Sequence, residues 1–153
     1  FSGMLTLPKA RKVEKQNRET AMHYLALTGM TGHAAADPFS LPYGLQRKLE
    51  IARALATQPK VLLLDEPGAG LNPMEICELI ELLHQLHKTM DLSILLIDHR
   101  MQLIMSLSSY IYVLNFGNLL AEGTPLEIQN NPDVNRAYMG DGGDFCCFLP
   151  QEA

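Results

Sequence analysis

Hydrophobic residues recur at helical spacing in three stretches of the chain, residues 9–30, 45–56 and 74–90. Spacings of three and four residues place apolar side chains on one face of a helix and leave the charged ones in water. In the first stretch the shared face consists of Val13, Ala21, Tyr24, Leu25 and Leu27. In the third it consists of Ile76, Leu79, Ile80, Leu83 and Leu86. These patterns predict amphipathic helices.

Two short runs, residues 61–64 and 93–97, are almost continuously apolar. They are too short for buried helices and too uninterrupted for half-exposed strands, so they predict parallel strands that are buried on both faces. Residues 110–115 and 119–123 predict a hairpin that turns at Phe116-Gly117-Asn118. The chain is therefore expected to form an α/β fold with a parallel sheet core and flanking helices.

Helix-capping residues follow the hairpin. Thr124 is suited to the N-cap of a helix, Pro125 to its first position and Glu127 to the third position of a capping box. Another helix is expected to begin at residues 131–133 and to end near Gly140. The glycine-rich, then apolar, stretch 141–153 is expected to fray.

Two adjacent carboxylates, Asp65 and Glu66, end the first apolar run, and His99 follows the second. Ligands of open α/β sheets bind beyond the carboxyl ends of the strands. Carboxylates at the end of a buried strand are costly unless something binds them, and magnesium with a nucleotide phosphate is the usual reason. The alternative is a strand that runs into an acidic turn, with a structural histidine nearby.

A glycine-containing turn, Leu41-Pro42-Tyr43-Gly44-Leu45-Gln46, opens the second predicted helix. The N-terminus of a helix presents backbone N–H groups and a positive dipole end, and phosphate is a natural ligand there. An ordinary loop that leads into a helix is the alternative. The order in which helix, turn and Asp-Glu strand follow one another favours the phosphate interpretation.

Composition narrows the class of protein. Of 153 residues, 47% are hydrophobic and 19% are charged, which is typical of one soluble globular domain. A net charge of −5 and a pI of about 5.5 argue against nucleic acid as a partner. Three cysteines, two of them adjacent at Cys146 and Cys147, form no secreted disulfide framework and suggest a reducing cytosol. No membrane span or signal peptide is evident, and a chain that begins with Phe1 is expected to be a piece of something longer.

The run from Leu41 to Pro73 resembles the signature motif, the Walker B strand and the D-loop of ABC-type ATPases. Residues 41–45 stand where that family has Leu-Ser-Gly-Gly-Gln, and Asp65-Glu66 match its Walker B aspartate and catalytic glutamate. Leu-x-Tyr-Gly-x-Gln-Arg-x-Leu-Glu-Ile-Ala-Arg and Ala-Gly-Leu-Asn-Pro are similar to segments in the ATP-binding subunits of branched-chain amino acid importers. The resemblance covers about residues 1–140.

The resemblance implies a role for each matching residue. Glu66 would polarise the water that attacks the γ-phosphorus of ATP, His99 would position phosphate and water, and Asp65 would hold Mg²⁺ mostly through water. The signature turn would bind the ATP of a second subunit through Leu41, Tyr43, Gly44, Leu45 and Gln46. The D-loop, which would couple the two sites of the dimer, consists of Ala69, Gly70, Leu71 and Asn72. ATP and Mg²⁺ are the implied cofactors.

The same resemblance implies the C-terminal portion of an ABC-type, P-loop NTPase-like nucleotide-binding domain. Residues 1–44 would be part of the helical subdomain, residues 45–140 half of the RecA-like core, and residues 141–153 a flexible tail. The expected partners are a second ATPase subunit, in a homodimer or heterodimer, and the membrane permease subunits of an importer. Branched-chain or other hydrophobic amino acids are the expected cargo, and the expected location is cytoplasmic, at the inner face of the cell membrane.

The sequence departs from the family pattern at several positions. Pro42 replaces the signature serine and Leu45 the signature glutamine, which removes polar contacts to phosphate. The histidine is flanked as Asp98-His99-Arg100, where the family usually has Glu-His-Asp, so the neighbouring charges differ.

No Gly-x-x-x-x-Gly-Lys-[Ser/Thr] phosphate loop occurs in the 153 residues. We therefore expect that this chain alone neither binds ATP tightly nor hydrolyses it. Two other functions stay open: a soluble ABC ATPase of DNA repair or translation, and a truncated, non-catalytic interaction module.

Overall fold

The computed structural model describes residues 8–139 of the chain. These residues fall into two compact units. The first unit takes in the residues up to 62 together with 91–93, and the second takes in 63–90 and the residues from 94 onward. Within residues 8–139, no helix combines the length and the apolar character that a membrane span requires.

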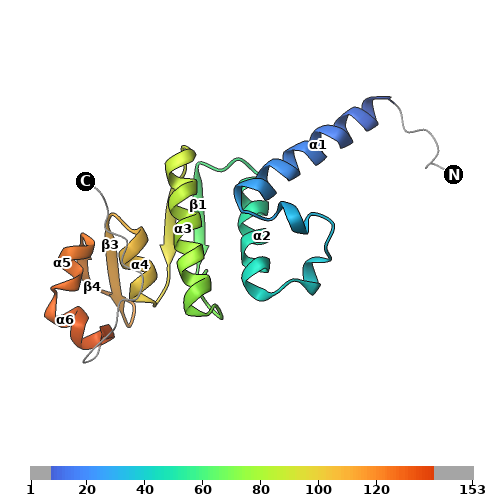
Figure 1. The fold of residues 1–153 in the computed structure, drawn as a ribbon. Coiled ribbons are helices and arrows are strands. Elements are labelled where there is room, and N and C mark those ends of the chain that lie inside the picture. Colours follow the sequence, from blue (N-terminus) through green and yellow to red (C-terminus); the bar gives the residue numbers. More distant parts are fainter. Residues whose placement is uncertain (1–7, 140–153) are drawn as a thin grey trace. The chain divides into compact units, whose positions relative to one another are not determined.

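The first unit is mainly helical. Helix α1 (Pro8–Leu27) packs against helix α2 (Tyr43–Leu55), as Figure 1 shows. Between them lie two 3₁₀ turns, Thr31–His33 and Pro38–Ser40. The buried side chains of this unit include Tyr24, Met30, Leu41, Ile51, Ala52 and Leu55. The core therefore lies between the C-terminal part of α1 and the length of α2.

The predicted apolar face of α1 is only partly buried. Tyr24 is buried, but Val13 is 53% exposed and Ala21 is also exposed. The prediction fails there because α1 has 20 residues and α2 only 13, so the N-terminal turns of α1 extend past α2 (Figure 1). Gly29, with a φ of 70°, follows the end of α1 in the left-handed conformation that glycine tolerates best.

Strands β1 (Val61–Asp65) and β2 (Ser93–Ile97) pair with each other. The Ser93 N–H donates to the Lys60 carbonyl at 2.9 Å, next to the first residues of both strands. The Glu66 N–H donates to the Ile97 carbonyl at 2.8 Å, next to their last residues. Starts pair with starts and ends with ends, so the two strands are parallel and their carboxyl ends lie together.

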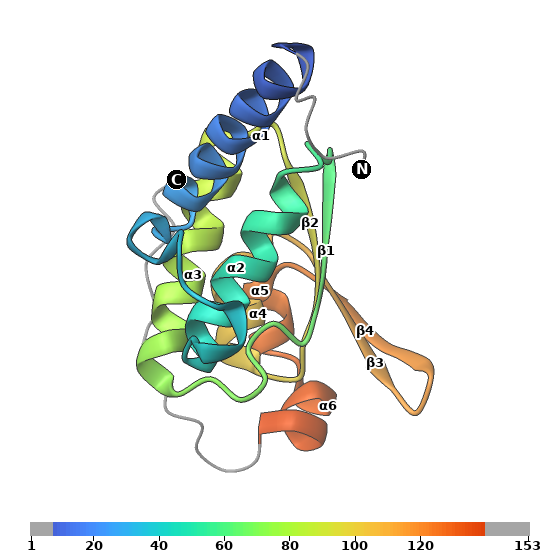
Figure 2. The same cartoon turned by 90° about the vertical axis from the view of Figure 1, so that its right-hand side faces the viewer.

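The prediction that these strands are buried on both faces is wrong. Alternate side chains are solvent-exposed: Val61 at 53%, Leu63 at 68%, Leu95 at 56% and Ile97 at 60%. A parallel strand is buried on both faces only if a layer packs on each of them. Figure 2 shows α3 and α4 to the same side of the pair. Among residues 8–139, each of these four side chains remains more than half exposed.

The second unit is built on helix α3 (Pro73–Thr89), which packs against helix α4 (Met101–Leu107). All five residues of the stripe predicted for α3 are buried, so that prediction is confirmed. The helix begins with a capping box in which the Asn72 side chain accepts from the Glu75 N–H at 3.0 Å and Glu75 accepts from the Asn72 N–H at 2.9 Å. This box fixes the end of the loop that leads from β1 into α3.

The predicted hairpin is confirmed as β3 (Ile111–Asn115) and β4 (Asn118–Gly123), which pair antiparallel. Its two-residue turn, Phe116-Gly117, has positive φ at both positions, which suits the right-handed twist of the strands. Helix α5 (Pro125–Gln129) begins with the predicted Thr124–Glu127 capping box. Helix α6 (Pro132–Val134) follows and continues as a π-helical turn, Asn135–Met139.

A hydrophobic cluster joins these C-terminal elements to α4. Its buried members are Ile104, Met105, Ile111, Val113, Ile128 and Val134. The expected tail at residues 141–153, including Cys146 and Cys147, lies outside the described residues.

Candidate functional site

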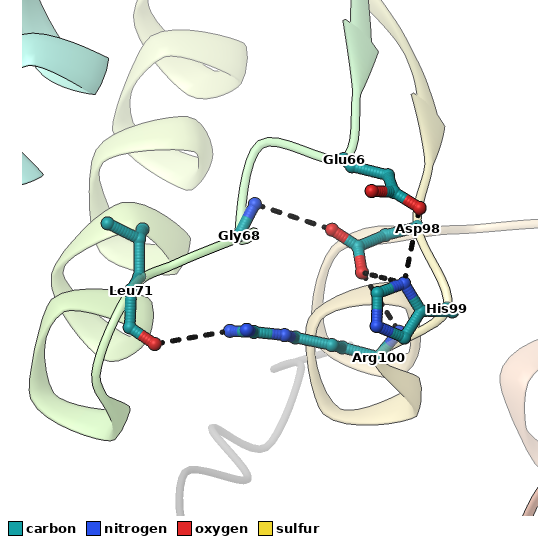
Figure 3. Close-up of polar contacts among 6 residues, drawn as sticks. All are labelled: Glu66, Gly68, Leu71, Asp98, His99 and Arg100. Atoms are coloured by element: carbon teal, nitrogen blue, oxygen red, sulfur yellow. Dashed lines mark hydrogen bonds and ion pairs between the residues drawn. The ribbon is translucent and has the colours of Figure 1, made fainter. Parts of the chain in front are cut away.

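Glu66 and His99 lie together at the carboxyl ends of β1 and β2 (Figure 3). The carboxylate Oε1 of Glu66 is 3.4 Å from Nδ1 of His99, and both side chains are more than half exposed to solvent. This distance is slightly longer than the roughly 2.7–3.2 Å of an N–H···O hydrogen bond. The two groups are therefore neighbours that share an open surface, within reach of a small ligand. The sequence predicts this pairing.

The backbone of Glu66 has an unusual conformation. Its φ is 44°, in the left-handed region that residues other than glycine rarely occupy, while its N–H remains bonded to the end of β2. Such strain is retained where the surrounding structure requires it, and it concentrates at functional sites. The left-handed turn makes the chain leave the strand abruptly at the residue that carries the candidate catalytic carboxylate.

The loop from Glu66 to Asn72 is held by its own backbone. The Ala69 N–H donates to the Glu66 carbonyl at 3.0 Å, and the Leu71 N–H donates to the Gly68 carbonyl at 3.2 Å. Gly70 has a φ of 76°, which an L side chain would occupy only with strain. The loop therefore consists of two successive tight turns, and it contains all four predicted D-loop residues, Ala69, Gly70, Leu71 and Asn72.

Two side chains beside His99 also reach this loop (Figure 3). The Gly68 N–H donates to Oδ2 of Asp98 at 3.3 Å, and the Arg100 guanidinium donates to the Leu71 carbonyl at 3.4 Å. Asp98 and Arg100 are absent from the candidate residues that the sequence suggests. A signal for them was available in the sequence: two opposite charges flank His99 at the end of a strand. Charged groups at such a position need partners, so these two side chains could have been expected to bind nearby groups.

The candidate metal ligand, Asp65, is exposed at the end of β1. Its carboxylate oxygens are of the type that Mg²⁺ prefers, and Mg²⁺ usually keeps several of its waters and binds only one or two protein carboxylates. Among the described residues, no three or more His, Cys, Asp or Glu side chains gather as a metal-binding group. An exposed single carboxylate fits an ion that is held mostly through water and phosphate oxygens.

The signature turn belongs to the first unit. Leu41 and Gly44 are buried, Tyr43 is 45% exposed, and Pro42 occupies the N-cap of α2 without a side-chain cap. The side-chain amide of Gln46 donates to the Leu41 carbonyl at 2.8 Å, which closes the turn. The first N–H groups of a helix have no acceptor within the helix, so this end of α2 retains the features that favour an anion.

Charged and aromatic side chains stabilise the first turns of α2. The Arg47 guanidinium lies 5.0 Å from the centre of the Tyr43 ring and donates to Glu50 Oε2 at 2.7 Å. The hydrogen bond to Glu50 raises the pKa of Arg47 above its ordinary value, so the guanidinium stays charged. Tyr43, the aromatic residue of the turn, is thereby held against α2.

Comparison with known proteins shows which family the chain resembles. Residues 4–69 match the family model described as ABC transporter, and residues 118–144 match the model described as branched-chain amino acid ATP-binding cassette transporter. The chain therefore resembles ABC transporter ATP-binding proteins. The first match includes the signature turn and Glu66, and His99 lies between the two matches.

Similar proteins agree with this resemblance. The high-affinity branched-chain amino acid transport ATP-binding protein LivG of Salmonella typhimurium is 50% identical over 141 residues, which are 92% of this chain and 55% of LivG. The corresponding protein BraF of Pseudomonas aeruginosa is 44% identical over the same shares of each chain. The chain thus spans about half the length of the curated relatives that it matches.

The fold agrees as well. The structure of cbiO1 from Clostridium perfringens, described as part of the ABC transporter complex cbiONQ, superposes with a TM-score of 0.72 at 28% identity. The matched region covers 88% of this chain and 51% of cbiO1. The expected α/β, ABC-type fold class is therefore confirmed, and as with the relatives, only about half of the solved domain is represented.

Proposed function

We propose that this chain is the C-terminal part of the ATP-hydrolysing subunit of an ABC importer for branched-chain or other hydrophobic amino acids. The observation that carries the proposal is the position of Glu66 and His99, 3.4 Å apart at adjacent strand ends. The names of LivG and BraF, both branched-chain amino acid transport ATP-binding proteins, support the type of cargo.

In this proposal Glu66 and His99 are the catalytic residues. Glu66 polarises a water molecule for attack on the γ-phosphorus of ATP, with cleavage of the bond to the bridging oxygen and release of ADP and phosphate. His99 positions the γ-phosphate and the attacking water. Both side chains are exposed, which leaves room for nucleotide and water on the side where they meet.

Asp65 holds Mg²⁺, mostly through water, when nucleotide is bound. Magnesium supplies neutralisation of the charge on the phosphate oxygens. Asp65 and Glu66 are adjacent residues with different tasks, and the left-handed φ of Glu66 supports that division because it turns the second carboxylate away from the strand direction.

The signature turn serves a second subunit. Gly44 and the N-terminal N–H groups of α2 bind the γ-phosphate of the partner's ATP, with Leu41, Tyr43, Leu45 and Gln46 shaping the turn. Ala69, Gly70, Leu71 and Asn72 couple the two sites of the dimer. Residues 1–44 dock on the membrane permease subunits, at the cytoplasmic face of the membrane.

A phosphate loop must come from outside these 153 residues. The chain covers only 55% of LivG. The exposed apolar side chains of β1 and β2 present a surface on which further polypeptide can pack. Exposed apolar clusters of this kind commonly mark interaction surfaces. ATP hydrolysis is therefore a property of the assembled domain, and the chain alone is inactive.

The test is ATP hydrolysis by a fused protein, in which the part of Salmonella typhimurium LivG that this chain does not match precedes Phe1. We expect magnesium-dependent hydrolysis, and we expect Glu66→Gln to lower kcat by at least about a thousandfold, as for loss of a group that acts in the transition state. The Glu66→Gln protein should still form dimers when ATP is added, as measured by light scattering.

Two measurements complete the test. Glu122→Gln, a matched change of an exposed glutamate on β4, should leave hydrolysis unchanged. Isothermal titration of ATP into the unfused chain should give no binding in the micromolar range. Hydrolysis at full rate by the Glu66→Gln protein, or tight ATP binding by the chain alone, would refute the proposal.

A further inference from the structure

Asp98 is an acidic residue whose side chain is completely buried, at the end of β2. Its two oxygens have separate tasks: Oδ1 accepts the Arg100 N–H at 2.9 Å, and Oδ2 accepts the Gly68 N–H at 3.3 Å. Burying a carboxylate is costly unless hydrogen bonds to it compensate. An asparagine could not replace both bonds, since it has one acceptor oxygen where Asp98 has two.

Arg100 extends the same connection. Its guanidinium Nη1 donates to the Leu71 carbonyl at 3.4 Å, and its aliphatic part packs near Gly68, where a Cβ would lie 3.6 Å from Cδ of Arg100. The backbone adds a third link, from the Glu66 N–H to the Ile97 carbonyl. Residues 66, 68 and 71 are thus bonded in order to residues 97, 98 and 100. Figure 3 shows the second and third of these links.

We propose that Asp98 and Arg100 are positioning residues that hold the loop 66–72 against the turn that carries His99. The link through Ile97 needs only backbone, whereas the other two links depend on these two side chains. We call these two side chains, with their bonds to Gly68 and Leu71, the clamp. The clamp fixes the loop on both sides of Ala69-Gly70 and so keeps Glu66 and His99 in position relative to each other. It rests on the proposed function only for its effect on catalysis.

The clamp also has a consequence for coupling. Gly68 and Leu71 are buried, while Gly70 between them is exposed. A partner that contacts Gly70 therefore displaces a loop that is bonded at Gly68 and Leu71 to the two neighbours of His99. Movement of the tip and movement of the histidine turn are therefore linked through Asp98 and Arg100. Neither side chain needs to contact nucleotide to have this effect.

The first test uses the full chain and amide hydrogen exchange measured by NMR. Loss of one hydrogen bond corresponds to about fivefold or more in local opening. The single oxygen of asparagine can keep only one of the two bonds, so Asp98→Asn should accelerate exchange at the Gly68 or the Arg100 amide at least about fivefold. The Leu83 amide, in the buried centre of α3, serves as the internal reference for global opening.

Arg100→Met tests the second anchor independently, should Asp98→Asn fail to fold. It should shift the carbonyl ¹³C resonance of Leu71 and accelerate exchange at the Leu71 amide, and Arg100→Lys should restore most of both. Asp91→Asn and Arg136→Met, two matched changes at exposed positions, should leave these signals unchanged. Acceleration at Leu83 equal to that at Gly68 and Arg100, or no acceleration at either Gly68 or Arg100, overturns the clamp.

The second test uses the fused protein, and it separates positioning from mere support of the fold. Asp98→Asn and Arg100→Met should lower kcat about tenfold or more, because small misplacements of catalytic groups are that costly. The KM for ATP should stay within about twofold, and Arg100→Lys should recover most of the lost kcat. Unchanged kcat in both variants overturns the proposal.

The outcomes distinguish this proposal from the proposed function. If the fused protein does not hydrolyse ATP at all, the proposed function fails, and the exchange data on the full chain still decide the clamp. If Glu66→Gln abolishes hydrolysis while Asp98→Asn and Arg100→Met do not reduce it, the proposed function stands and the clamp is refuted.

Discussion

Two turns in this chain are candidates for contact with phosphate, and they are held in different ways. The signature turn is closed by near neighbours: Gln46 bonds to Leu41, five residues away, and Arg47 to Glu50. The loop 66–72 has local backbone bonds as well, but it is also held by contacts from residues about 30 positions later, Asp98 and Arg100. A turn of the first kind depends on its own sequence, whereas one of the second kind depends on the core that brings distant segments together.

The largest expected effect comes from truncating a buried core side chain in the unit that carries one of the two turns. Leu103 on α4 is completely buried, and its side chain lies 3.5 Å from where a Cβ on Gly68 would be. Leu103→Ala should cost roughly 2–5 kcal/mol of stability. Amide exchange at Gly68 should accelerate accordingly, while the Gln46 amide, which donates to the Pro42 carbonyl, should change little.

Leu55→Ala in α2 is the matched variant, since Leu55 is also completely buried but lies in the first unit. It should produce the reverse pattern, with faster exchange at Gln46 and little change at Gly68. If either substitution accelerated both amides equally, the two turns would share one cooperative core and the contrast between them would be lost.

The same contrast explains what could be predicted from sequence. The stripe of α3, the hairpin and the Thr124–Glu127 capping box depend on residues at most a few positions apart, and all three were predicted. The turn was expected to take in Phe116-Gly117-Asn118, but Asn118 already belongs to β4. The sequence also predicted that Glu66 and His99 lie close together, because the carboxyl ends of neighbouring parallel strands lie at the same edge of a sheet.

Features that depend on distant partners were not predictable in this way. The apolar runs of β1 and β2 indicated burial on both faces, but burial requires a second layer that residues 8–139 do not supply. Likewise, a sequence with Asp98 and Arg100 beside a histidine does not reveal which backbone groups they bind. Their partners, Gly68 and Leu71, are fixed only by the pairing of β1 with β2.

A smaller effect is expected from the hydrogen bond that closes the signature turn. Gln46→Ala removes the 2.8 Å bond to the Leu41 carbonyl and should cost about 0.5–1.5 kcal/mol in urea unfolding of the full chain. Gln85→Ala, an exposed position on α3, is the control and should stay within about 0.5 kcal/mol of the parent. A cost equal to that of the control would mean that the turn does not rely on this local bond.

Pro42→Ser should have a still smaller net effect. The serine hydroxyl can cap α2, which should stabilise the fold by about 1 kcal/mol. Loss of proline gives the unfolded chain more conformational entropy, which should destabilise the fold by about 0.4–1 kcal/mol. Stability should therefore stay within roughly 0.5 kcal/mol, while the Gly44 amide, near the new cap, exchanges more slowly. Faster exchange at Gly44 would show that the rigidity of Pro42, and not capping, organises the turn.

The smallest effect concerns a third local turn, the capping box of α5, which is held by a charge. Hydrogen bonds from the Thr124 N–H and hydroxyl to Glu127, at 2.7 and 2.9 Å, lower the pKa of this carboxyl below its ordinary value of 4.5. A lowered pKa in the folded state stabilises the fold at pH values above the ordinary pKa. This contribution is lost as the pH falls through the lower, folded-state value, so α5 should fray only in acid.

An NMR titration should place the Glu127 carboxyl midpoint below 4.5, with the Thr124 amide shift following it. In Glu127→Gln, which keeps a neutral acceptor, the Thr124 amide should be insensitive to pH over this range. A Glu127 midpoint at or above 4.5 would mean that the box is not formed in solution, and that this local turn, unlike the signature turn, depends on contacts beyond its own residues.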